Sequence, residues 1–175
     1  MCKQFFAFYL VHKHKYQGVT MQTLKIGELA PTFTLLNPKK ESISLSQFKG
    51  KKVLVYFYPK ALTPGCTTQA CNLRDYKTEL DNLNVVILGI SPDSPEKLAK
   101  FQEKKALNFT LLSDENHEIA EQFGVWGEKK FLGKTYDGIH RTSFLIDENG
   151  YIEQVFSQFK TSNHHQILLD YLTQK

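Results

Sequence analysis

The chain has 175 residues, of which 41% are hydrophobic and 23% are charged, a length and balance that suit one globular domain with a substantial core. Its net charge is +4, but three of its lysines lie in the first 20 residues, which contain no acidic residue; the remainder has 19 basic and 18 acidic residues. No long Lys/Arg run or interleaving of basic with aromatic residues is present, so the sequence gives no support for nucleic-acid binding.

The first 20 residues differ from the rest of the chain. An apolar run from Phe5 to Val11 is far too short to span a membrane and is not followed by a small-residue cleavage site. We expect residues 1–20 to be a disordered extension, or an artefact of an upstream start with Met21 as the true first residue. Residues 21–175 are then predicted to form a single domain without membrane association.

The next elements alternate between strands and helices. Residues 30–36 and 42–45 predict a hairpin across Asn37-Pro38, and Ser46 is expected to cap a short turn. The β-branched and aromatic run at 53–58 predicts a strand buried on both faces. Further strands are expected at 84–91 and 109–112, a hairpin at 143–147 and 151–156, and helices from Ser94-Pro95, at 116–123 and at 163–172. This order indicates an α/β fold with helices covering a sheet.

The segment after the 53–58 run places a cysteine at the start of a helix. Thr63 is expected to cap the helix through its hydroxyl and Pro64 suits the first helical position, so Cys66 falls in the first turn. The helix dipole there favours a thiolate by at most about 1 kcal/mol. A guanidinium at roughly 4 Å would contribute up to about 4 kcal/mol before desolvation. We therefore expect an arginine to face Cys66.

Cys71 lies five residues after Cys66. In an intact helix this spacing separates the two Cα atoms by roughly 8.5 Å, beyond the limit of about 7 Å for a disulfide. A bond between the two cysteines would therefore require the start of the helix to unwind. The C-x-x-C spacing of an ordinary dithiol carrier is absent.

Pro59, Thr63 and Cys66 stand in the spacing P-x-x-x-T-x-x-C, which resembles the active-site motif of the peroxiredoxins. The resemblance is closest to one subfamily, the bacterioferritin comigratory protein or peroxiredoxin Q. The residues that carry this closer resemblance are Cys71 and the segments 123–129, 138–147 and 160–165. The resemblance runs from about Met21 to the C-terminus. The resemblance implies a thioredoxin-like fold, with a central mixed sheet flanked by helices and an N-terminal hairpin.

The resemblance also implies a mechanism. The Cys66 thiolate attacks a peroxide oxygen, water or an alcohol leaves, and the resulting sulfenic acid condenses with Cys71 to an intrachain disulfide that thioredoxin reduces. Thr63 orients the peroxide and Arg141 stabilises the thiolate and the developing charge. Gly65 allows close approach of the substrate, and Pro59 completes the substrate-binding motif. No metal, haem or flavin is implied.

Two other classes stay open on the residues alone: a general disulfide oxidoreductase, and a redox-sensing or chaperone-like protein. Arg74, the second of two arginines, suits a surface or capping contact. His140 is expected to be structural, and His164 and His165 are adjacent, so they do not face one metal. Because one chain contains both cysteines, we expect a monomer, and a transient disulfide suits the reducing cytoplasm.

Overall fold

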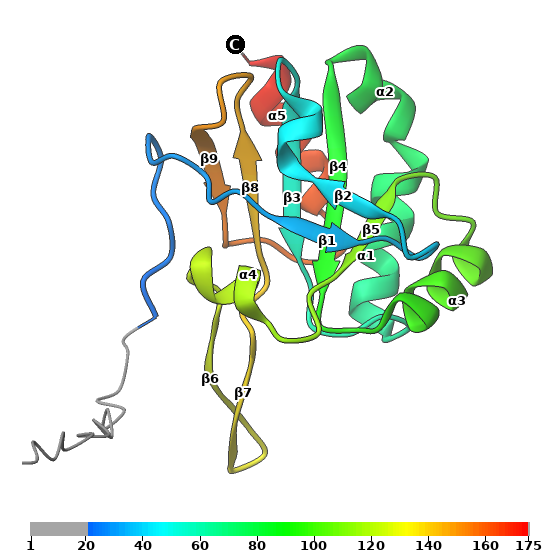
Figure 1. Ribbon diagram of the computed structural model, residues 1–175, viewed down its shortest axis with the longest axis vertical. Coiled ribbons are helices and arrows are strands. Elements are labelled where there is room, and N and C mark those ends of the chain that lie inside the picture. Colours follow the sequence, from blue (N-terminus) through cyan, green and yellow to red (C-terminus); the bar gives the residue numbers. More distant parts are fainter. Residues whose placement is uncertain (1–20, 175) are drawn as a thin grey trace, which may run out of the picture.

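A sheet of seven strands forms the centre of the computed structural model, which describes residues 21–174 (Figure 1). The strand order is β2-β1-β5-β4-β3-β8-β9; β3, β4 and β5 are parallel, and the other pairs are antiparallel. The strands are β1 (Thr34–Leu36), β2 (Ser42–Ser44), β3 (Lys52–Phe57), β4 (Val85–Ser91), β5 (Thr110–Ser113), β8 (Thr142–Ile146) and β9 (Ile152–Phe156). The predicted mixed sheet and N-terminal hairpin are confirmed.

Helices cover both faces of this sheet, as the sequence predicts (Figure 1). One face packs against α1 (Pro64–Asp75), α2 (Lys77–Asn82), α3 (Pro95–Lys105) and α5 (His164–Thr173). The other packs against α4 (Glu118–Gln122) and the 3₁₀ helix η1 (Leu45–Phe48). Among residues 21–174, no helix combines the length and apolar character needed to cross a bilayer.

Strand β3 is buried on both faces because its side chains alternate between two apolar clusters. Leu54 and Tyr56 face the cluster that contains Cys66, whereas Val53 and Val55 face the cluster beside α4. All four side chains are almost fully buried. This explains why the run has no polar alternation, and it places the loop that follows β3 at the surface of a rigid core.

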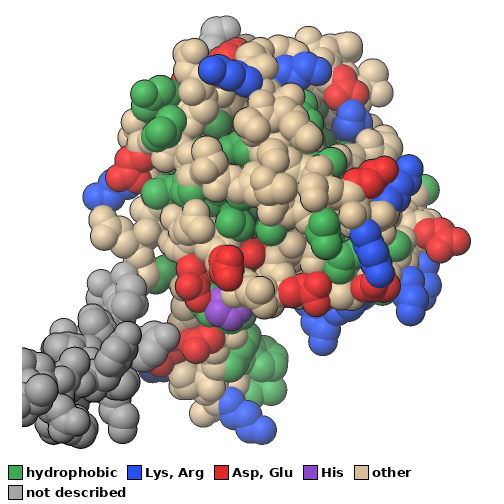
Figure 2. Space-filling model, in the orientation of Figure 1, with side chains coloured by type: hydrophobic (Ala, Val, Ile, Leu, Met, Phe, Trp, Pro, Cys, Tyr) green, Lys and Arg blue, Asp and Glu red, His purple; other side chains and the backbone are tan. Residues whose placement is uncertain are grey.

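One local expectation was wrong, and one pair of strands was missed. The 3₁₀ helix begins after Ser44 rather than at Ser46, and the Gln47 side chain accepts a hydrogen bond from the Ser44 backbone N–H. A second, two-stranded sheet, β6 (Trp126–Phe131) with β7 (Lys134–Ile139), was not predicted. It projects from the body (Figure 1), and Leu132 at its turn is 85% exposed, in the part of the molecule where Figure 2 shows exposed hydrophobic side chains.

The contact between Gly89 and Tyr56 tests the packing of β4 on β3. The two residues are paired in register, and a Cβ on Gly89 would lie 2.8 Å from the Tyr56 ring. We expect Gly89→Ala to lower the free energy of unfolding by about 1–3 kcal/mol in urea titrations. Gly127→Ala, which meets only the flexible Met21 side chain at 3.4 Å or more, is the control. Equal small effects of the two substitutions would contradict this packing.

Candidate active site

Cys66 lies in the first turn of α1, directly after the loop that follows β3. The side chain is 1% exposed and belongs to the apolar cluster between the sheet and α1. Thr63 occupies the N-cap position and Pro64 the first helical position, as the sequence predicts. The predicted hydroxyl cap is wrong, however, because the Thr63 hydroxyl donates a hydrogen bond to the Lys60 carbonyl at 2.7 Å.

Arg141 is the arginine that faces Cys66. It lies between β7 and β8, and its Nη2 is 3.3 Å from the Cys66 sulfur. Because β8 is antiparallel to β3, the beginning of β8 meets the end of β3, where Phe57 pairs with Thr142. A guanidinium at this distance interacts favourably with a negatively charged sulfur. The sheet topology therefore brings together two residues that lie 75 positions apart.

Gln69 and His164 extend this contact, and sequence reasoning missed both as part of the site. The Gln69 side chain accepts a hydrogen bond from Arg141 Nη1 at 2.5 Å, and its Nε2 lies 3.2 Å from His164 Nδ1. Both side chains are buried. Gln69 could have been suspected from its position three residues after Cys66, on the same helix face. His164 carried no such signal, since it comes from α5.

His164 is an uncharged ring at neutral pH. Burial lowers the pKa of His164 to about 3, and the positive charge of Arg141 and then His165 act in the same direction. The ring packs against Phe159, with centroids 4.3 Å apart, and lies near Tyr56 at 6.3 Å. A neutral imidazole has one nitrogen that accepts a hydrogen bond, so His164 can act as an acceptor over the physiological range.

The loop between β3 and α1 is held by Asp93, a second contact that the sequence did not reveal. The Asp93 carboxylate accepts hydrogen bonds from the Ala61 backbone N–H at 2.6 Å and the Ser91 hydroxyl at 2.9 Å, and it pairs with Lys97. The next residue, Leu62, has a φ of +65°, a left-handed conformation that is strained for a leucine. Asp93 thus anchors the loop at its strained position.

Gly65 and Pro59 complete the sequence motif around Cys66. A Cβ on Gly65 would lie 3.6 Å from a methyl carbon of Thr161 and 3.8 Å from Arg141 Nη2, so it would narrow the space in front of the guanidinium. Pro59 directly follows Tyr58, whose backbone N–H donates to the Ile90 carbonyl and continues the ladder between β3 and β4. Pro59 lies where that ladder ends, as its missing N–H requires.

Cys71 lies on the same helix as Cys66, in the reduced state. Helix α1 is continuous over both residues, and both thiols are free; Cys66 is buried and Cys71 partly buried. Arg74 lies away from the sulfur of Cys66: it pairs with Asp75 and donates to the Lys105 carbonyl at 2.6 Å, at the end of α3. This is the surface and capping contact expected for it.

None of the histidines in residues 21–174 belongs to a metal site. Among the residues that the structure describes, no group of three or more His, Cys, Asp or Glu side chains could hold a metal ion. His140 contacts the Glu128 carbonyl at 3.1 Å, across the base of the hairpin, and His165 packs against Tyr76 with ring centroids 4.6 Å apart. Both contacts are structural.

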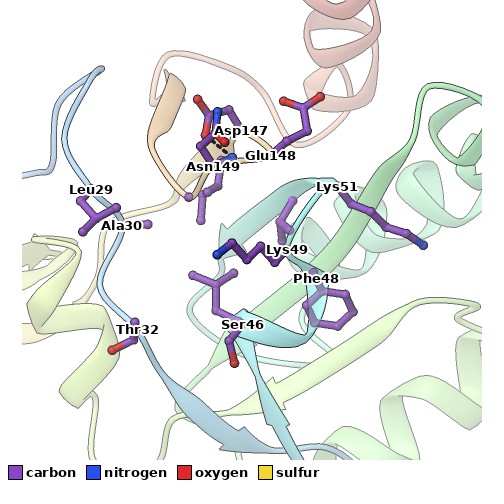
Figure 3. A pocket seen from close by; sticks show the side chains of 14 residues that line it. Leu29, Ala30, Thr32, Ser46, Phe48, Lys49, Lys51, Asp147, Glu148 and Asn149 are labelled. Atoms are coloured by element: carbon purple, nitrogen blue, oxygen red, sulfur yellow. Dashed lines mark hydrogen bonds between the residues drawn. The ribbon is translucent and has the colours of Figure 1, made fainter.

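A cavity of about 170 Å³ lies at the opposite end of β3 from Cys66 (Figure 3). It is bounded by Val53 at the start of β3, by η1 with Lys49, and by the turn between β8 and β9. Figure 3 shows Lys49 and Phe48 on one side and Asp147 and Asn149 on the other. The cavity is therefore separate from the cysteine site.

The fold and site define a thioredoxin-like oxidoreductase with a buried cysteine and a facing arginine. The model of the AhpC/TSA family matches residues 26–155, and the chain belongs to this family. It is 69% identical to a bcp peroxiredoxin of Haemophilus influenzae over 87% of this chain and 98% of that protein. The chain is thus a peroxiredoxin, a thiol peroxidase, which confirms the resemblance and decides against the two other classes.

Solved structures agree with this assignment. The peroxidoxin BcpB of Mycobacterium tuberculosis is 35% identical, with a TM-score of 0.77 over 86% of this chain and 97% of that one. A bacterioferritin comigratory protein of Xanthomonas campestris is 31% identical, with a TM-score of 0.76 over 81% of this chain and 90% of that one. The thioredoxin-like fold and the subfamily are therefore those that the motif indicated.

The lowered pKa of His164 predicts a pH-dependent contribution to stability. Between about pH 3 and 6.5, the unfolded chain binds a proton at this histidine that the folded chain excludes, so this contribution is lost as the pH falls through that window. We expect the unfolding free energy of the parent to fall more steeply on acidification than that of His164→Phe. Urea titrations across the window measure the difference, and parallel curves would contradict it.

Proposed function

We propose that this peroxiredoxin reduces hydrogen peroxide and organic hydroperoxides through Cys66, with Arg141 as the residue that stabilises the reacting charges. The 3.3 Å contact between the Arg141 guanidinium and the Cys66 sulfur is the observation that carries the proposal. Organic hydroperoxides are included because the related Xanthomonas campestris structure is described in terms of alkyl peroxide reduction activity.

In the first step, the Cys66 thiolate attacks one peroxide oxygen. A sulfur–oxygen bond forms, the oxygen–oxygen bond breaks, and the leaving oxygen takes a proton to become water or an alcohol, so that Cys66 becomes a sulfenic acid. The Arg141 guanidinium stabilises charge on the departing oxygen. Thr63 donates its proton to the Lys60 carbonyl, which leaves the lone pairs of its hydroxyl to accept a hydrogen bond from the peroxide.

The backbone of α1 supplies further donors. The first helical hydrogen bond runs from the Thr67 N–H to the Thr63 carbonyl, so the Gly65 and Cys66 N–H groups precede it. Such unpaired groups at a helix start bind an electron-rich oxygen. With no Cβ at Gly65, the space between Thr161 and the guanidinium remains available to the substrate.

In the second step, the Cys71 thiol attacks the sulfenic sulfur, and the disulfide forms as water leaves. Because an intact helix keeps the two Cα atoms roughly 8.5 Å apart, α1 must first unwind. Unwinding breaks the Gln69–Arg141 hydrogen bond and the bond from the Asn72 amide to the Ser162 carbonyl, 3.2 Å long. These contacts keep α1 folded until Cys66 is oxidised.

The disulfide is then reduced by an external dithiol, which we propose to be thioredoxin. Two thiols are oxidised there for each peroxide reduced, so the cycle needs no metal, haem or flavin. Since both cysteines belong to one chain, a monomer suffices for catalysis. A reducing cytoplasm fits this cycle, because structural disulfides do not persist in that compartment and catalytic ones are transient.

Oxidation products provide the first test. After one equivalent of hydrogen peroxide, we expect a Cys66–Cys71 disulfide in the parent, a Cys66 sulfenic acid in Cys71→Ser, and neither in Cys66→Ser, as measured by mass spectrometry. Fast oxidation of the parent without this disulfide would contradict Cys71 as the resolving residue. Disulfide exchange without peroxide turnover would contradict the peroxidase mechanism itself.

Arg141→Lys tests the guanidinium contact. Lysine retains the positive charge but lacks the planar fork of donors, so we expect kcat/KM for peroxide to fall by about 100-fold. The thiolate fraction of Cys66, followed by ultraviolet absorbance against pH, should fall as well. Arg74→Lys is the matched control, because Arg74 contacts Asp75 and the Lys105 carbonyl instead. Unchanged kinetics in Arg141→Lys would overturn the role.

A further inference from the structure

A single chain of contacts connects α5 to the reactive sulfur. It runs from Cys66 to Arg141 at 3.3 Å, from Arg141 to Gln69 at 2.5 Å, and from Gln69 to His164 at 3.2 Å. Gln69 is 0% exposed and His164 is 1% exposed, so water does not compete for these contacts. His164 is the last member, and the mechanism above does not use it.

The donor at each step follows from the chemistry of the groups. A guanidinium only donates, so the Gln69 atom that faces Arg141 is the carbonyl oxygen. The other end of the amide, Nε2, also only donates, so His164 Nδ1 is the acceptor. If the Gln69 amide were flipped, its NH₂ group would face the N–H groups of the Arg141 guanidinium, donor against donor. The acceptor at His164 therefore supports the same orientation of the Gln69 amide that the guanidinium requires.

As a side chain that only fills the core, His164 would be less favourable for stability than an apolar residue. With Nδ1 as acceptor, the ring proton is on Nε2, and this buried atom has no hydrogen-bond partner among the described residues. An unpaired buried donor is destabilising, and an apolar side chain stacked on Phe159 would not carry one. The ring thus offers one interaction that such a side chain cannot, the lone pair directed at Gln69.

We propose that His164 is a positioning residue for the peroxidase reaction: through the Gln69 amide, it holds the Arg141 guanidinium against the Cys66 sulfur. The inference rests on the proposed roles of Cys66 and Arg141. It also makes α5 part of the working site, because the acceptor for Gln69 comes from outside the helix that carries both cysteines. When α1 unwinds, Gln69 leaves both partners together, and refolding restores both contacts.

The test uses substitutions at position 164 that separate the packing of the ring from its role as a hydrogen-bond acceptor. His164→Phe keeps a ring beside Phe159 but removes the acceptor, and we expect kcat/KM for hydrogen peroxide to fall up to about 100-fold, with a smaller thiolate fraction of Cys66 against pH. His164→Asn places an amide oxygen near the position of Nδ1 and should restore most of both. His165→Phe is the matched control, since His165 packs on Tyr76 and should leave both unchanged.

A double-mutant cycle tests whether His164 acts through Gln69. If it does, His164→Phe combined with Gln69→Leu should be no slower than Gln69→Leu alone. Multiplicative losses, or a normal thiolate titration in a folded His164→Phe, would overturn the inference. If His164→Phe does not fold, His164→Leu takes its place. A loss of kcat/KM in His164→Asn as large as the loss in Gln69→Leu would also overturn the inference.

The parent enzyme and Cys66→Ser separate this inference from the proposed function. A parent that does not reduce peroxide, or a Cys66→Ser variant that still does, would reject the proposed function. An active, Cys66-dependent parent with an equally active His164→Phe would reject only the role of His164.

Discussion

The rest of the site depends on the antiparallel pairing of β8 with β3. Parallel pairing would place the start of β8 beside the start of β3, at the end of the molecule where the Lys49 cavity lies. Antiparallel pairing instead sets Thr142 opposite Phe57, so that Arg141 meets the loop that leads into α1. The sheet topology thus places the Arg141 guanidinium beside the Cys66 sulfur. Because both faces of β3 are buried, the register of this pairing is strongly specified.

The two steps of the proposed reaction need different conformations of α1. In the mechanism that we propose, peroxide reduction needs the helix folded, because the first turn presents Cys66 to Arg141. Formation of the proposed Cys66–Cys71 disulfide needs the same helix unwound. Side-chain hydrogen bonds join the helix to its neighbours at a few positions: Gln69 bonds to Arg141 and His164, Asn72 to the Ser162 carbonyl, and Arg74 to the Lys105 carbonyl at the far end of the helix. A helix held by a few polar contacts and a short apolar face can open locally without loss of the sheet.

Sequence predicted the parts of this protein that depend on local pattern. The run at 53–58, the Asn149-Gly150 turn and the Ser94-Pro95 helix start each carry a local physical cause, and each prediction is confirmed. The hairpin of β6 and β7 was missed because its residues are mostly polar and exposed, without a buried face to impose alternation. Gln69 and His164 were missed as partners because 95 residues separate them, and only the packing of α5 on α1 joins them.

Some groups in unfavourable conformations or environments lie near Cys66. Leu62 has a left-handed backbone, and the buried Tyr56 and Tyr58 hydroxyls, like His164 Nε2, have no hydrogen-bond partner among residues 21–174. Burial also raises the pKa of both tyrosines, which keeps them uncharged beside the sulfur. Each of these features costs free energy, and the apolar packing on both faces of β3 offsets it. The packing of the core thus holds these groups in a fixed arrangement beside Cys66, although each alone is unfavourable.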